Sequence, residues 1–247
     1  MLLAGKKALV TGASRGIGKA IALAYAAEGA DIAVTSRKYA NLTPLIEEIQ
    51  NMGRKAIGFE WDISRIDKID QRIEKIADKL EGLDTVVNNA GIIVKEKFLE
   101  VSEKGWDIVI DTNLKGLYFI CQSAANLMIE RKQSGKIINI ASDAGLRGAK
   151  EPYGISKWGV IGLTRGIAKI LLPYGILVNA IAPGPVATEI RNWYPGQSVE
   201  ITSPTSPALP FQRRAYPDEI AKLAVFLASE NSSRIAGSVI TINGGLF

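Results

Sequence analysis

The sequence predicts a single α/β domain in which a doubly wound, seven-stranded parallel sheet carries helices on both faces. Three observations predict this fold class. Short apolar segments alternate with helical segments of ten or more residues along the whole chain. The expected strands are nearly all apolar instead of apolar at every second residue, as in strands buried on both faces. No low-complexity linker or second alternating block interrupts the 247 residues, so we expect one domain over residues 1–247.

The strands are expected where short runs rich in Val, Ile and other apolar residues occur. In chain order they are residues 7–11, 31–35, 55–60, 85–88, 136–141, 177–182 and 239–242.

The helices are expected where apolar residues recur near the helical period, as Ile69, Ile73 and Ile76 do. The first follows a glycine-rich turn and ends near Gly29. The others cover residues 41–52, 65–80, 102–131, 153–172 and 217–228. We expect the longest of them to bend or split near residues 113–116.

Residues 189–216 form the one long irregular segment, rich in Pro, Ser and Thr. Its prolines argue against a continuous helix, and long connections in compact domains tend to be lids, binding loops or disordered. We expect a substrate lid here, with Trp193, Tyr194 and Phe211 as its apolar cover. An ordinary surface loop is the alternative.

Histidine is absent and Cys121 is the only cysteine. No internal disulfide can form, and Ser-His-Asp catalysis, Cys-His catalysis and imidazole-dependent zinc sites are excluded. An enzyme of this composition would take its acid–base groups from Tyr, Lys, Asp or Glu. We predict no metal site.

The formal net charge is +5, and the Lys and Arg residues are scattered rather than gathered in a stripe with aromatics. We therefore expect no nucleic-acid partner. Residues 170–188 are uncharged, but three prolines and Asn179 interrupt them, so no membrane span is predicted. The N-terminus meets Lys6 and Lys7 too early for a secretory signal, and a cytoplasmic location is expected.

A glycine-rich turn, T-G-A-S-R-G-I-G, follows the first expected strand at residues 11–18. Such glycines permit a tight turn, a close approach of backbone to phosphate, and close packing of helix on strand. The following helix N-terminus offers unpaired N–H groups to an anion. We interpret the segment as a dinucleotide cradle rather than a simple tight turn, with contacts from Gly12, Ser14, Arg15, Gly16, Ile17 and Gly18.

Tyr153 and Lys157 stand four residues apart in an expected helix, so phenol and ammonium share a face. A phenol ordinarily has a pKa near 10. A neighbouring ammonium favours the phenolate and lowers that pKa. The pair could therefore exchange a proton with an alcohol or ketone; an aromatic residue beside a solvated lysine is the alternative.

Further motifs follow the glycine-rich turn in chain order. Before the Tyr153–Lys157 pair come N-N-A-G at residues 88–91, Asn113 and Ser142, and after it comes P-G-P-V-A-T at residues 183–188. With them the chain resembles the short-chain dehydrogenase/reductase family from Lys7 to Gly245. The resemblance implies a single-domain Rossmann fold and hydride transfer between a nicotinamide and a ketone or secondary-alcohol carbon.

The resemblance also implies roles for four residues. Tyr153 would be the general acid/base, and Lys157 would lower its pKa and hold the nicotinamide ribose. Ser142 would hydrogen-bond the substrate oxygen as charge develops. Asn113 would bend the long helix and join Lys157 to a proton relay.

Other positions are implied in cofactor binding. Either Asn88 or Asn89 would also brace the central strands, and Asp62 could instead be a helix N-cap before Ser64. The implied contacts are Asp62, Ile63, Asn89, Ala90, Gly91, Pro183, Gly184, Val186 and Thr188.

The end of the second expected strand bears on cofactor choice. NAD sites place a carboxylate there for the ribose 2′-OH. Here Ser36 and Arg37 follow instead, and Arg37 with Arg15 could clamp a 2′-phosphate. NADP (as NADPH) is therefore favoured over NAD.

Two departures from the family pattern stand out. The spacing from Ser142 to Tyr153 is shorter by about two residues than in many relatives. This puts the substrate contacts of the intervening segment in doubt. Asn243 stands where an Asp often precedes the final Gly-Gly.

These features predict an NADPH-dependent ketone reductase, similar to the 3-oxoacyl-[acyl-carrier-protein] reductases, acting on a small-molecule carbonyl or alcohol. A sugar, polyol or small-alcohol dehydrogenase is one alternative, and a non-catalytic NADP-binding sensor is another. The resemblance implies a homotetramer or homodimer, and the apolar residues Trp158, Val160, Ile161 and Leu163 give it weak support.

Overall fold

The computed structural model describes residues 1–188 and 205–246, and within them a single parallel sheet forms the centre of the molecule. The strand order is β3-β2-β1-β4-β5-β6-β7, which confirms the predicted seven-stranded sheet. The strands are β1 (Lys7–Val10), β2 (Asp31–Ser36), β3 (Ala56–Glu60), β4 (Thr85–Asn88), β5 (Gly135–Ile140), β6 (Ile176–Pro183) and β7 (Val239–Ile242).

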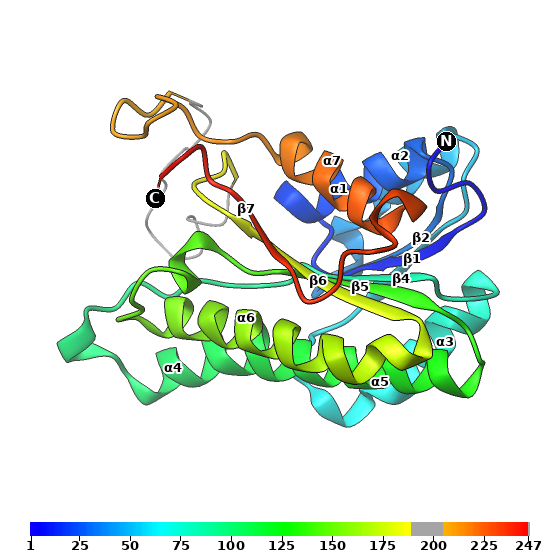
Figure 1. Ribbon diagram of the computed structural model, residues 1–247, viewed down its shortest axis with the longest axis horizontal. Helices are drawn as coiled ribbons and strands as arrows, with labels where there is room; N and C mark the ends of the chain where they lie inside the picture. The colour runs from blue at the N-terminus through cyan, green and yellow to red at the C-terminus, as the bar shows by residue number, and fades with distance from the viewer. Residues whose placement is uncertain (189–204, 247) are drawn as a thin grey trace.

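Helices cover both faces of this sheet, as predicted (Figure 1). One face carries α1 (Gly16–Ala27), α2 (Thr43–Asn51) and α7 (Pro217–Ala228). The other carries α3 (Ile69–Leu80), α4 (Glu103–Ile110), α5 (Leu117–Glu130) and α6 (Pro152–Leu171).

The core consists of two apolar layers, one on each side of the sheet. Successive residues of a strand point to opposite faces. In β1, Leu9 packs toward α3, α5 and α6, whereas Ala8 and Val10 pack toward α1, α2 and α7. This two-sided burial explains why apolar residues follow one another along the strands instead of alternating with polar ones.

The long helix predicted at residues 102–131 is interrupted where expected. A π-helical turn, η4 (Asp111–Gly116), separates α4 from α5. The helix predicted at residues 65–80 starts later than expected, because Ile66–Lys68 form a 3₁₀ turn and α3 begins at Ile69.

The strand order places a crevice at the carboxyl end of the sheet. The chain runs outward from β1 to β3 and then returns to β4 on the other side of β1. The loops after β1 and β4 therefore diverge, which is where open α/β sheets bind ligands.

The predicted lid at residues 189–216 lies mostly outside the described residues, including Trp193 and Tyr194. In its described part, Ala215 pairs with Val186 in a parallel bridge. Phe211 is exposed and lies beside Gly244. The lid stays a prediction. In the described part of the chain, no helix has both the length and the apolar character needed to cross a membrane.

Candidate active site

A cleft of about 1200 Å³ opens at the carboxyl end of the strands. Of the predicted site residues, only Gly18 and Asn113 do not line it. The predicted residues in its wall are Gly12, Ser14, Arg15, Gly16, Ile17, Ser36, Arg37, Asp62, Ile63, Asn89, Ala90, Gly91, Ser142, Tyr153, Lys157, Pro183, Gly184, Val186 and Thr188.

The glycine-rich turn is packed directly against the loop after β4. Gly12 has a φ of +63°, and a Cβ there would lie 2.7 Å from the Ala90 Cα. Thr11 Oγ1 accepts from the backbone N–H groups of Asn89 and Ala90, at 3.0 and 3.1 Å. Only glycine at position 12 allows this close approach of the two loops.

Asn88 and Asn89 brace different parts of the site. Asn89 Nδ2 donates to the carbonyl oxygens of Thr11 and Gly12, both at 3.0 Å, and so holds the glycine-rich turn. Asn88 Nδ2 donates to Asn139 Oδ1 at 2.9 Å and ties β4 to β5. Gly18 serves packing, since a Cβ there would collide with Asn89.

The N-terminus of α1 faces the cleft without a capping side chain. Arg15 occupies the N-cap position and makes no side-chain cap hydrogen bond, and the first turn has no acidic residue. Thr188 lies opposite, its methyl carbon 3.3 Å from where a Cβ of Gly16 would be. The end of α1 can therefore receive a phosphate.

Tyr153 and Lys157 lie on the first turns of α6, and both line the cleft. Lys157 Nζ donates to the Ile140 carbonyl oxygen at 2.7 Å and lies 5.8 Å from the centre of the Tyr153 ring. Burial lowers the pKa of Lys157 to about 8, because a desolvated ammonium is costly.

Ser142 follows β5 and is buried at the edge of the cleft. Its Oγ accepts from the backbone N–H of Ala144 at 3.2 Å and donates to Asp143 Oδ1 at 3.3 Å. Ser142 and Tyr153 thus line the same cleft.

Asn113 sits in the π-helical turn, behind the cleft rather than in its wall. Its side chain exchanges two hydrogen bonds with the backbone of Ile92, both at 2.8 Å, and donates to Ser156 Oγ at 3.2 Å. A Cβ on Gly91 would lie 3.3 Å from Asn113 Oδ1 and 3.6 Å from Lys157 Nζ. Asn113 thus connects the loop after β4 with α6, next to Lys157.

Arg15, Arg37 and Asp62 all line the cleft, and the charges of Arg15 and Asp62 both act on Arg37. Burial lowers the pKa of the Arg37 guanidinium, the Asp62 carboxylate opposes that shift, and the Arg15 charge adds to it. Asp62 does not cap a helix: its Oδ1 accepts from the Ser64 N–H and hydroxyl at 3.1 and 2.7 Å. Two like charges gathered beside a cleft favour an anionic ligand.

Four charged residues that line the cleft were not among the predicted site residues: Lys38, Asp143, Arg147 and Glu151. The last three come from the shortened segment between Ser142 and Tyr153. The shortened spacing from Ser142 to Tyr153 drew attention to this segment. The residue types within the segment gave no reason to choose these three residues.

The shortened segment is packed tightly on α6. It starts with a 3₁₀ turn, η5 (Asp143–Gly145). A Cβ on Gly145 would lie 2.6 Å from the Lys157 carbonyl carbon and 2.7 Å from the Trp158 nitrogen. With Gly145 packed this closely on α6, Asp143 at the start of the segment lines the cleft.

Asn243, the second departure from the family pattern, supports the loop after β6. Its Oδ1 accepts from the Gly245 N–H at 3.2 Å, and a Cβ on Gly184 would lie 2.8 Å from its Cα. The residue thus lies close against Gly184, which lines the cleft.

Comparison with known proteins gives consistent matches. The model of a family described as enoyl-(acyl carrier protein) reductase matches residues 12–247. A curated 3-oxoacyl-[acyl-carrier-protein] reductase of Aquifex aeolicus is 38% identical over 99% of this chain and 98% of its own.

Two crystal structures also match over nearly the whole chain. A short-chain type dehydrogenase/reductase of Mycobacterium marinum has a TM-score of 0.89 at 34% identity, covering 99% of this chain and 96% of its own. An acetoin dehydrogenase of Salmonella typhimurium has a TM-score of 0.88 at 32% identity, covering 98% and 95%.

Proposed function

We propose a reaction for this chain, which belongs to the short-chain dehydrogenase/reductase family and is an oxidoreductase of that family. The enzyme transfers a hydride from NADPH to a ketone, or from the matching secondary alcohol to NADP. The observation that carries the proposal is the meeting of Tyr153, Lys157 and Ser142 in one cleft, beside an uncapped helix N-terminus.

The residues present fit a dinucleotide bearing an extra phosphate. A volume of about 1200 Å³ exceeds the ~300–1,000 Å³ of ordinary small-molecule pockets. The glycine-rich turn and the start of α1 would hold the pyrophosphate. Arg37 and Arg15 would clamp the 2′-phosphate, since no carboxylate occupies residues 36–38.

Tyr153 would carry the proton. When bound, the nicotinamide supplies or accepts the hydride. In ketone reduction, the Tyr153 hydroxyl gives its proton to the carbonyl oxygen as the C=O π bond breaks. In alcohol oxidation, Tyr153 takes that proton back. The Ser142 hydroxyl would hydrogen-bond the same oxygen and stabilise its developing negative charge.

Lys157 and Asn113 would assist proton transfer by Tyr153. The Lys157 ammonium favours the phenolate form of Tyr153 and so lowers the pKa of the phenol. Asn113 positions the backbone beside Lys157 through its bonds to Ile92. With all four residues present in one arrangement, a catalyst is favoured over a non-catalytic NADP-binding sensor.

Two substrate classes are supported by different findings. Identity to curated 3-oxoacyl-[acyl-carrier-protein] reductases favours a 3-oxoacyl thioester. The charged residues Asp143, Arg147 and Glu151 in the cleft wall favour a more polar substrate, such as a sugar, polyol or other small alcohol. Likeness to an acetoin dehydrogenase agrees with the second class.

The test is NADPH consumption with acyl-thioester, sugar and small ketones, compared with NADH, for the wild type and Tyr153→Phe. We expect wild-type turnover with NADPH and a loss in kcat on the order of 10²–10⁴-fold in the variant, with cofactor binding retained. Near-normal turnover by Tyr153→Phe would reject the proton-transfer role, and a wild-type preference for NADH would reject the cofactor assignment.

A further inference from the structure

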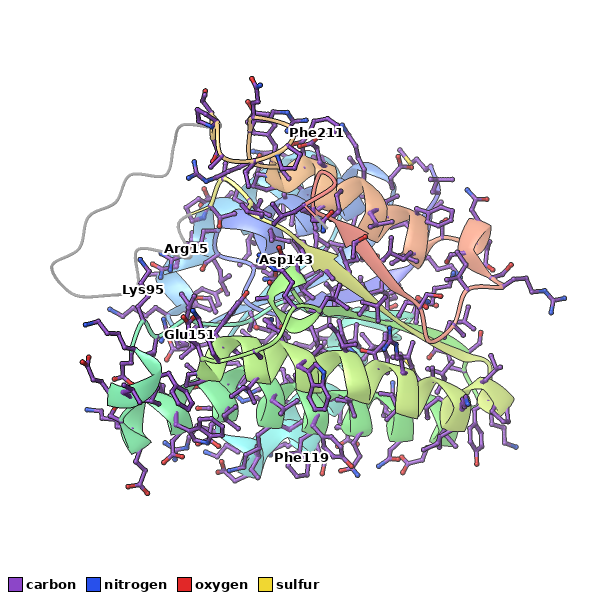
Figure 2. The ribbon with its side chains drawn as sticks, turned by 60° about the vertical axis from the view of Figure 1, so that its left-hand side comes forward. Arg15, Lys95, Phe119, Asp143, Glu151 and Phe211 are labelled. Atoms are coloured by element: carbon purple, nitrogen blue, oxygen red, sulfur yellow. The ribbon has the colours of Figure 1, made fainter. Side chains whose placement is uncertain are left out.

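The carboxylate of Asp143 is a buried charge in the wall of the cleft, next to Ser142. Its side chain is only 7% exposed. Oδ1 accepts from the Ser142 hydroxyl at 3.3 Å, and Oδ2 accepts from Arg147 Nη2 at 3.0 Å. Figure 2 shows Asp143 above Glu151, at opposite ends of the segment that leads into α6.

The position of Asp143 is set by its own segment. The backbone N–H groups of Leu146 and Arg147 donate to the Asp143 carbonyl oxygen, at 2.9 and 3.3 Å. Gly145 rests on the backbone of α6. Because backbone contacts hold η5, the carboxylate is in place before a substrate arrives.

Asp143 lines the cleft and retains acceptor capacity. An ionised carboxylate offers about four lone-pair sites, and its two side-chain partners use one site on each oxygen. A hydrocarbon group placed against such an acceptor would strip its solvation and return no hydrogen bond. A hydroxyl group would return one.

The neighbouring charges also disfavour an anionic substrate group. Among the residues of this segment that line the cleft, two carboxylates, Asp143 and Glu151, stand against one guanidinium, Arg147. Arg147 is already paired with Asp143. This segment, taken by itself, therefore suits a neutral hydrogen-bond donor.

We propose that Asp143 accepts a hydrogen bond from a hydroxyl on the carbon next to the reacting carbonyl, so that the substrates are hydroxy ketones and the matching vicinal diols. The inference rests on the proposed function, in which Ser142 binds the carbonyl oxygen. Ser142 Oγ and Asp143 Oδ1 lie 3.3 Å apart. A serine hydroxyl has one proton, so when it turns from Asp143 to the carbonyl oxygen, Asp143 Oδ1 can accept from a hydroxyl on the adjacent carbon. Reduction then consumes one NADPH and one proton and yields the diol.

The test compares two small ketones of nearly equal size, 1-hydroxy-2-butanone and 3-pentanone, in which a hydroxyl is replaced by a methyl. For each enzyme, the quantity measured is the ratio of kcat/KM for the hydroxy ketone to kcat/KM for 3-pentanone. Comparing ratios between enzymes cancels the different intrinsic reactivity of the two ketones. It also cancels any damage to Ser142, which would slow both ketones alike.

We expect Asp143→Ala to lower this ratio by about 10–100-fold, as for loss of a hydrogen bond to a charged group. Asp143→Asn keeps the size of the side chain and a neutral acceptor, so its ratio should fall less. The control Glu230→Gln removes an exposed carboxylate outside the cleft, and its ratio should change by less than about threefold. Thermal melting of each variant verifies folding, and Asp143→Asn replaces Asp143→Ala if the latter unfolds.

An unchanged ratio in both Asp143 variants would overturn this inference while leaving the proposed function intact. An equal fall in Glu230→Gln would also overturn it, because the overall charge of the protein rather than contact with Asp143 would then select the substrate. A wild type that consumes NADPH with an acyl thioester but with neither small ketone would overturn the inference and leave the proposed function intact. A wild type that consumes NADPH with no carbonyl substrate of the whole panel would overturn both.

Discussion

The side chain of Arg37 carries most of the argument for NADP. In Arg37→Asp a carboxylate would repel the 2′-phosphate and accept hydrogen bonds from a ribose 2′-OH instead. We expect the ratio of kcat/KM for NADPH to that for NADH to fall by about tenfold or more. Arg234→Asp makes the same charge change at an exposed position outside the cleft and should leave the ratio unchanged. An unaltered ratio in Arg37→Asp would contradict the clamp.

Lys157 should make the stability of the cofactor-free protein depend on pH. Burial lowers its pKa from 10.5 to about 8. Below about pH 8 both folded and unfolded states hold the proton, and the folded state bears the full cost of a buried ammonium. Between about pH 8 and 10.5 only the unfolded state keeps the proton, so the free energy of unfolding rises with pH.

Urea unfolding of the wild type and Lys157→Met at pH 7, 9 and 10 measures this effect. The difference between the two proteins removes the titration of all other groups. We expect the wild type to gain stability relative to Lys157→Met between pH 8 and 10, by an amount on the order of 2–3 kcal/mol. A difference that is flat with pH would mean that Lys157 is not desolvated in solution.

At the scale of elements, the π-helical turn between α4 and α5 depends on one side chain. Asn113→Ala would leave the N–H and carbonyl of Ile92 without the partners they have in the fold. We expect a loss of about 1–3 kcal/mol in the free energy of unfolding, together with lower kcat.

The matched control is Ser156→Ala, which removes the third partner of Asn113 and leaves both bonds to Ile92. It should cost less stability than Asn113→Ala in the same urea titration. Equal losses in the two variants would show that the bonds to Ile92 are not what holds the turn.

At the scale of the whole molecule, the face formed by α4, α5 and α6 exposes large apolar side chains. Trp158 is 67% exposed and Ile170 is 66% exposed, and Trp106 and Tyr118 add to the same group of helices. Exposed apolar surface of this kind marks interaction sites. We expect a homodimer or homotetramer that uses this face.

Light scattering at micromolar concentration tests the assembly. The wild type should have two or four times the mass of one chain, and Trp158→Glu should shift the population toward smaller species. Phe98→Glu alters an exposed aromatic outside these helices and should leave the mass unchanged. A monomeric wild type would reject the assembly.

The sequence by itself determined the fold class and most element positions, and all but two of the site residues that it predicted line the cleft. The strands at residues 85–88 and 239–242 and the helix at residues 217–228 match β4, β7 and α7, because apolar runs ended by turn residues are local signals. The motif residues met in the cleft because the carboxyl ends of parallel strands share one edge of the sheet.

Only the tertiary structure decided features that depend on contacts between distant segments. Spacing could not separate the 3₁₀ turn at Ile66–Lys68 from α3, nor assign the bracing roles of Asn88 and Asn89, which depend on strand pairing. Asp143 entered the cleft because Gly145 packs on the backbone of α6, and no local pattern encodes that contact. Local periodicity fixes what each segment becomes, whereas burial and charge at the site arise only when segments far apart in the chain close on one another.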